Sequence, residues 1–318
     1  MRRIALALVL MGATAGVAAQ AWPAKPVRLI SQFPPGGGTD LIARNLIPSL
    51  SESFGQNFIL DHRPGAAGNI AAELVAKSAA DGYTILIANN TIVIQAAMSQ
   101  TLPFDVVRNF TPIAVIASTP VALAVHPSLP VRSVRDLIAL GRAQPGKLAY
   151  SSCGNGTAMH LAGELFKQLA KVDMTHVPYK GCGPAIVDGI AGQVPILFNT
   201  ITNTNPQAKG GRLRIIAIAS ATRSPVDRNL PTIAESGLAG FDSDIWFGFM
   251  GPAGLPRDIV TRLNAELARI VKLPNVSARL VDQLFDIRTG TPEEFGALIK
   301  ADVVKWGKVV RAGNIRAD

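Results

Sequence analysis

The sequence predicts an α/β protein of two lobes. Short apolar runs typical of strands alternate with helix-like patterns over most of the chain, which favours largely parallel sheets. One arrangement occurs twice: a strand, a glycine-rich turn, a threonine and an amphipathic helix follow one another at residues 27–50 and again at 148–169. The last part of the chain is nearly all helix and is expected to pack on the first lobe.

Residues 1–21 have the composition of a cleavable export signal. Arg2 and Arg3 precede an apolar run at 4–17, and residues 19–21, Ala-Gln-Ala, offer small side chains for cleavage. A membrane anchor is the alternative, but the apolar run is short for a bilayer. The rest of a twin-arginine signal is missing, so we expect a Sec-type signal and a periplasmic protein.

Hydrophobic spacing predicts the elements of the first lobe. An apolar run at 27–32 indicates a buried strand. Apolar residues from Leu41 to Leu50 then follow helical spacing, Pro48 predicts a kink or an early end, and Gly55 is a stop signal. Further strands are expected at 58–61, 83–88, 110–116 and 121–125, and a helix at 70–77.

Capping patterns mark two later helices. Ser133 with Asp136 resembles a capping box. Thr291, followed by Pro292 and by Glu294, is a strong helix start in the tail. The remaining expected elements are strands at 148–151, 174–177, 194–198, 213–219 and 245–250, and helices at 160–169 and 184–190.

The simplest domain organisation inserts one lobe into the other. We expect the first lobe at residues 22–122 and 245–318 and the second at 123–244, with strands near 121–125 and 245–250 as the two crossovers.

Composition and motifs exclude several classes of protein. The formal net charge is +9, but the basic residues are scattered with few aromatics among them, which argues against a nucleic-acid surface. The four histidines lack paired metal-ligand spacing, and no G-x-S-x-G elbow is present. The sequence therefore predicts no metal, no cofactor and no hydrolase of that kind.

Residues 33–40, Phe-Pro-Pro-Gly-Gly-Gly-Thr-Asp, are the first candidate binding element. Three glycines let the backbone approach a ligand, whereas a plain strand-to-helix turn would need only one. The segment lacks the last glycine of a dinucleotide fingerprint and the Gly-Lys-Ser/Thr of a P-loop. Its counterpart at 153–157 offers a second helix N-terminus at the carboxyl edge of a strand. Two such ends facing each other predict a clamp for a small anion.

The two cysteines leave an enzymatic alternative open. Cys153 near a helix N-terminus could have a lowered pKa, and His160 follows seven residues later, so a thiol nucleophile is conceivable. Seven residues are about two helical turns, which brings both side chains near one face but out of direct reach. We therefore expect a binding protein and not an enzyme.

Several short motifs match one known family in fixed order along the chain. They are residues 33–40, 63–69 (Arg-Pro-Gly-Ala-Ala-Gly-Asn), 81–84 (Asp-Gly-Tyr-Thr), 161–166 (Leu-Ala-Gly-Glu-Leu-Phe), 177–181 (Val-Pro-Tyr-Lys-Gly) and 291–295 (Thr-Pro-Glu-Glu-Phe). With these motifs the chain resembles the Bug family, the extracytoplasmic solute receptors of tripartite tricarboxylate transporters.

The resemblance implies a type II Venus-flytrap fold that closes on a small organic acid, usually a carboxylate, and delivers it to membrane subunits of a transporter. A monomer is expected. By position, the ligand-binding residues would be Phe33, Pro35, Gly36, Gly37, Gly38, Thr39, Asp40, Asn89 and Asn90 in the first lobe, Ser152, Cys153, Gly154, Gly156, Thr157, His160, Tyr179, Gly181 and Asn199 in the second, and Trp246 on the return crossover.

The chain departs from the family's pattern at four positions. Asn199 stands where an aspartate is frequent, which makes an amino-acid-like ligand less favoured. Pro195 would place its strand at a sheet edge. Cys153 and Cys182 would form a disulfide or remain two thiols, and an oxidising compartment favours the disulfide. Two functional alternatives remain: a sensory binding protein for a membrane signalling partner, and a thiol-dependent hydrolase.

Overall fold

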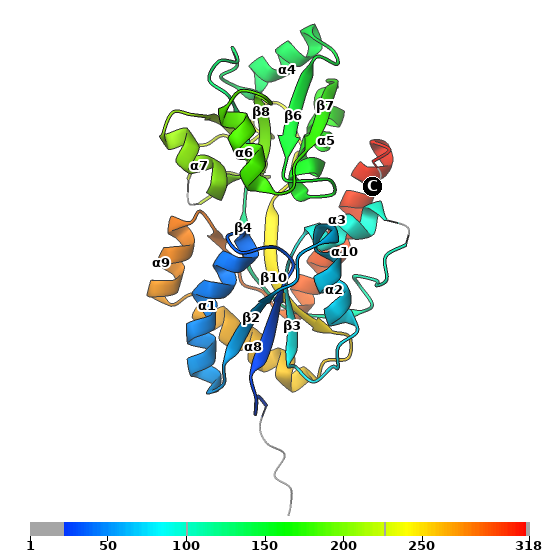
Figure 1. Cartoon of the computed structure of the whole chain (residues 1–318), viewed down its shortest axis with the longest axis vertical. Coiled ribbons are helices and arrows are strands. Elements are labelled where there is room, and N and C mark those ends of the chain that lie inside the picture. The colour runs from blue at the N-terminus through cyan, green and yellow to red at the C-terminus, as the bar shows by residue number, and fades with distance from the viewer. Residues whose placement is uncertain (1–21, 100, 226, 316–318) are drawn as a thin grey trace, which may run out of the picture.

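The chain folds into two lobes, each built around one β-sheet (Figure 1). This computed structural model describes residues 22–99, 101–225 and 227–315. The predicted export signal at 1–21 lies outside the described residues.

The first sheet contains strands from both ends of the chain. Its order is β11-β4-β10-β3-β1-β2. β1 is parallel to β2 and β3, whereas β10 is antiparallel to both β3 and β4. The bounds are β1 Val27–Ser31, β2 Phe58–His62, β3 Thr84–Asn89, β4 Phe110–Thr119, β10 Ile245–Pro252 and β11 Asp286–Ile287.

The second sheet has the order β7-β6-β8-β5-β9. β6 is parallel to β7 and β8, and β5 is antiparallel to β8 and β9. The expectation of largely parallel sheets is therefore wrong: both sheets are mixed, because the strands that carry the chain between lobes run against their neighbours. The bounds are β5 Val121–Val125, β6 Leu148–Ser152, β7 Met174–Pro178, β8 Ile196–Thr200 and β9 Arg214–Ile218.

The expectation that Pro195 marks an edge strand is also wrong. β8 lies between β6 and β5, inside the sheet. Pro195 immediately precedes β8, and its carbonyl accepts a hydrogen bond from the His126 N–H at 2.8 Å. At this position a proline costs the strand ladder no amide donor.

The helices follow the predicted caps in most places. Gly55, with a left-handed φ of 64°, caps the C-terminal end of α1, and α10 begins with a complete capping box between Thr291 and Glu294. α1 runs through Pro48 without the early end, because its apolar face remains buried down to Phe54. The bounds are α1 Gly38–Phe54, α2 Asn69–Ala76, α3 Thr91–Met98, α4 Val134–Ala143, α5 Ala158–Ala170, α6 Cys182–Ile190, α7 Ile201–Lys209, α8 Arg257–Ile270, α9 Pro274–Asp282 and α10 Pro292–Ala312, with the 3-10 helix η1 at Ala66–Gly68.

The tail helix α10 contacts both lobes. It packs on α3 and β4 through buried side chains that include Phe295 and Trp306. Figure 1 shows it running from the first lobe toward the second, where it meets α5. There the Gln168 amide donates to the Val309 carbonyl at 3.0 Å. A second contact joins the lobes near their centre, where the Gln95 amide of α3 donates to the Gly156 carbonyl at 3.1 Å.

Candidate ligand-binding cleft

A cavity of about 610 Å³ lies between the two lobes. Both lobes and the return strand β10 contribute to its walls. It is lined by Phe33, Pro34, Pro35, Gly36, Gly37, Gly38, Asn89, Thr91, Thr119, Cys153, Thr157, Ala158, Met159, Lys180, Gly181, Cys182, Gly183, Pro184, Ile186, Thr200, Thr202, Asn203, Gln207, Ile245, Phe247 and Phe285.

The first turns of five helices contribute to this lining. Residues at the N-termini of α1, α3, α5, α6 and α7 all take part, and each helix directly follows a strand of one of the two sheets. The free N–H groups and the positive dipole end of a helix favour an anion. Among the described residues that line the cavity, Lys180 carries the only charge. The cleft is therefore suited to a small anion.

The glycine-rich turn of the first lobe fits tightly against β10. Gly36 has a positive φ of 87°. At Gly38 an added Cβ would lie 2.5 Å from Cζ of the Phe247 ring, so only glycine leaves room for that ring. Close packing and a left-handed residue thus shape the turn.

Asp40 supports this turn from behind and does not line the cavity. Its carboxylate accepts hydrogen bonds from the Gly36 N–H at 3.0 Å, from Arg44 Nε at 2.9 Å and from His62 Nε2 at 2.8 Å. Burial alone would raise the pKa of Asp40, but these hydrogen bonds outweigh it and hold the pKa below its usual value. Asp40 is therefore an anionic brace for the turn.

His160 plays a comparable role in the second lobe. Its Nδ1 accepts a hydrogen bond from the Gly156 N–H at 3.1 Å, and its ring stacks on His176 with centroids 3.9 Å apart. Burial, with a smaller effect of Lys167, lowers the pKa of His160 to about 4. The ring is thus neutral near pH 7 and free to accept the hydrogen bond that holds the second glycine-rich turn.

Cys153 and Cys182 are joined by a disulfide bond, with their Cα atoms 4.3 Å apart. The bond ties the turn before α5 to the start of α6, and both cysteines line the cavity. The Gly181 N–H also donates to the Cys153 carbonyl at 3.1 Å. With both sulfurs bonded, the structure offers no thiol nucleophile in the parts of the chain that it describes.

About half of the predicted site residues lie in the cavity wall. These are Phe33, Pro35, Gly36, Gly37, Gly38, Asn89, Cys153, Thr157 and Gly181. The others are not part of the lining: Thr39, Asp40, Asn90, Ser152, Gly154, Gly156, His160, Tyr179, Asn199 and Trp246. In this second group, the Tyr179 hydroxyl donates to Asp188 at 2.6 Å, and the Asn199 amide donates to the Cys182 carbonyl at 3.2 Å.

The geometry of β10 explains why Trp246, a predicted ligand-binding residue, does not line the cavity. Successive side chains of a strand point to opposite faces. On β10, Ile245 and Phe247 line the cavity, so Trp246 faces the other way. Its indole N–H donates to Asp302 of α10 at 2.7 Å, inside the first lobe.

The largest omission in the sequence prediction is α7. Thr200, Thr202, Asn203 and Gln207 line the cavity, and they follow a predicted strand in a stretch rich in hydroxyl and amide groups. Ligands of α/β proteins bind at such carboxyl edges, so this stretch carried a usable signal. Phe285, in the C-terminal part of the chain, also lines the cavity, and no sequence signal indicated this.

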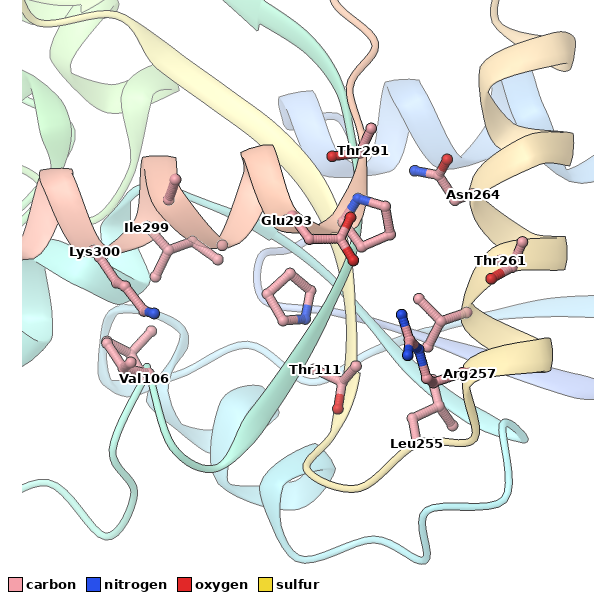
Figure 2. Close-up of a pocket in the computed structure, with 16 residues that line it drawn as sticks. Val106, Thr111, Leu255, Arg257, Thr261, Asn264, Thr291, Glu293, Ile299 and Lys300 are labelled. Carbon is pink, nitrogen blue, oxygen red and sulfur yellow. The ribbon is translucent and has the colours of Figure 1, made fainter.

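A second hollow of about 690 Å³ lies within the first lobe (Figure 2). Its sides are formed by α8, with Thr261 and Asn264, and by α10, with Glu293 and Lys300. The Asn264 amide there is already bonded to the carbonyls of Ile113 and Gly290. Closure of the two lobes cannot enclose a ligand in a hollow built from one lobe, so we assign the candidate site to the cavity between them.

Two further searches bear on the site. Over the ranges 22–99, 101–225 and 227–315, no helix is both long and apolar enough to cross a membrane. Within the same ranges, no group of three His, Cys, Asp or Glu side chains could hold a metal ion.

Two α/β lobes joined by crossover strands, with a cavity between them, define the fold of the periplasmic solute-binding proteins. The model of the tripartite tricarboxylate transporter family receptor matches residues 42–315, and the chain belongs to this family. Its relatives include protein BugT of Bordetella pertussis, which is 33% identical over 98% of this chain and 97% of its own length.

Solved structures of similar proteins agree with this assignment. Rpa4515 of Rhodopseudomonas palustris, solved with adipate, has a TM-score of 0.86 and 38% identity and covers 93% of this chain and 99% of its own. MatC from the same organism, with bound malate, has a TM-score of 0.82 and 29% identity over 91% of this chain and all of its own. The family is one of substrate-binding receptors, not of enzymes.

His160 gives a prediction for acid stability. A native pKa of about 4 against an ordinary value of 6.5 means that the unfolded state binds more protons in this range. The contribution of the neutral His160 ring to stability is fully present above pH 6.5 and is lost as pH falls toward 4. Between these limits we expect the free energy of unfolding of the wild type, relative to His160→Gln, to fall by about 2–3 kcal/mol.

The comparison with the variant is needed because a second group acts in the opposite direction. Burial raises the pKa of Asp244 to about 6, so its contribution favours folding at low pH and is lost as pH rises toward 6. Urea unfolding gives the free energy of unfolding of both proteins at several pH values. Because both contain Asp244, its effect cancels in the difference between them. A difference between the two that does not change with pH would contradict the prediction.

Proposed function

We propose that this protein is a periplasmic receptor that captures a small organic acid as its carboxylate between the two lobes. The observation that carries the proposal is the convergence of five helix N-termini on a cavity whose lining has one cation and no acidic side chain. The ligands adipate and malate in two related structures support the same class of ligand.

We further propose delivery of the ligand to membrane subunits of a tripartite tricarboxylate transporter. Membership of the receptor family supports this step. In the same proposal residues 1–21 direct export, the second lobe ends at 244/245 and begins with β5 instead of at the expected 122/123, since β5 pairs with β8 from Val121 onward, and the receptor acts as a monomer. Deletion of the gene is expected to abolish uptake of the captured acid even in cells that still contain the membrane subunits.

A charge placed in the cavity provides the sharpest test of anion binding. Thr202→Asp adds a carboxylate to the wall at α7, and two like charges about 5 Å apart repel strongly in this partly buried setting. We expect the affinity for a carboxylate to fall on the order of a hundredfold. Titration calorimetry on residues 22–318, with adipate and malate as probes, measures the loss.

Thr202→Asn is the matched control, because asparagine has the shape of aspartate without the charge. The proposal requires that Thr202→Asp binds much more weakly than Thr202→Asn. Equal affinities for the two variants would contradict the proposal. So would a thermal unfolding temperature that neutral solutes raise and that no organic anion raises.

A further inference from the structure

The wall of the cavity on the first-lobe side is largely hydrocarbon. Phe33, Ile245, Phe247 and Phe285 all take part. The rings of Phe247 and Phe285 pack edge to face with centroids 5.5 Å apart, and the close approach to Gly38 fixes the first of them. These four side chains present carbon to the body of a ligand and cannot bond to a hydroxyl.

Several polar groups of the lining are already bonded within the protein. The Thr119 hydroxyl donates to the Leu284 carbonyl at 3.0 Å, and the Thr157 hydroxyl donates to the Gly154 carbonyl at 2.8 Å. The Thr202 hydroxyl donates to that of Thr200 at 3.0 Å. The donors of these groups are therefore not available to a ligand that carries many hydroxyls.

The remaining polar side chains of the lining are Asn89 and Thr91 at the start of α3, Lys180, and Thr200, Asn203 and Gln207 at α7. The amide oxygen of Gln207 is buried and has no hydrogen-bond partner, and Asn203 lies on the same helix. A few polar side chains beside a hydrocarbon wall suit a ligand that is polar at its ends and apolar between them. An ammonium group would find no counter-charge, because no acidic side chain is among the lining residues.

We infer that the receptor selects carboxylates whose carbon body bears neither hydroxyl nor amino groups, over hydroxylated or amino-bearing acids with the same carbon skeleton and the same number of carboxylates. This inference rests on the proposed function. Its physical cause is the loss of water from each hydroxyl that enters the cavity without a partner, which costs about tenfold in affinity for every unpaired group.

The test compares pairs of acids by titration calorimetry on residues 22–318. Adipate and galactarate share a six-carbon chain and two carboxylates, and galactarate adds four hydroxyls. Benzoate and gallate form an aromatic pair, and 2-aminoadipate tests the amino group. We expect the unsubstituted member of a pair that binds to be at least a hundredfold tighter than its polyhydroxylated partner, and 2-aminoadipate to be weaker than adipate.

Two variants test whether the discrimination depends on the apolar lining, here on Met159 of α5 in the second lobe. Met159 lines the cavity and Met98 does not, and each is 8% exposed. Met159→Gln is expected to narrow the adipate-to-galactarate ratio severalfold, whereas Met98→Gln leaves the ratio as it is in the wild type.

The outcomes separate this inference from the proposed function. If galactarate or gallate binds as tightly as its partner, the inference is wrong while capture of an organic anion stands. If no carboxylate in the set binds, the proposed function is wrong and the inference falls with it.

Discussion

Gly38→Ala is expected to lower the free energy of unfolding by about 2–3 kcal/mol and to weaken carboxylate binding at least tenfold. The new methyl group would lie 2.5 Å from the Phe247 ring, so either the ring or the glycine-rich turn must move. Both form the cavity wall, and movement of either changes the surface that meets the ligand. Urea unfolding and titration calorimetry measure the two effects.

Gly296→Ala is the control for this substitution. Gly296 lies within α10 and outside the cavity between the lobes, and an added Cβ would make ordinary contact with Pro112 Cγ at 3.5 Å. Since alanine is the better helix former, stability should stay the same or rise slightly, and binding should not change. Wild-type affinity in Gly38→Ala would show that the Phe247 ring does not restrict the turn.

Elements with strong local signals were predictable from the sequence. Gly55 and the Thr291–Glu294 capping box fixed helix ends that depend on a few neighbouring residues. α3 and α7 were missed for opposite reasons. α3 is buried on nearly all sides, so its apolar residues show no single face, whereas α7 is rich in threonine and asparagine and contains Pro206. Tertiary packing overrides weak propensity in both helices.

The lining of the candidate site was predictable where backbone forms it and less so where side chains form it. The glycine-rich turns at Gly36–Gly38 and near Cys153 could be located because glycines and strand ends are visible in the sequence. The choice between Trp246 and Phe247 depends on the phase of the β10 pleat, and a shift of one residue reverses it. Phe285 reaches the cavity through the order of strands in the first sheet, which no local pattern encodes.

Removal of the Cys153–Cys182 disulfide is expected to cost about 3.5 kcal/mol of stability. The two cysteines are 29 residues apart, and a cross-link over a loop of this length restricts the unfolded chain by about that amount. Ligand affinity should fall as well, because the bond holds the turn before α5 against the start of α6 and both are part of the cavity wall. The Cys153→Ser/Cys182→Ser double variant, measured by urea unfolding and calorimetry, tests both effects.

Reductant supplies the matched comparison for this prediction. In the wild type it should reproduce the loss of affinity seen in the double variant, and in the double variant it should change nothing. Titration of thiols in the native, unreduced protein should find none among Cys153 and Cys182, since each is bonded to the other. Two reactive thiols in that protein, or a double variant that is as stable and binds as tightly as the wild type, would show that the second-lobe wall is held by its hydrogen bonds, such as those from Gly181 and Asn199, and not by the disulfide.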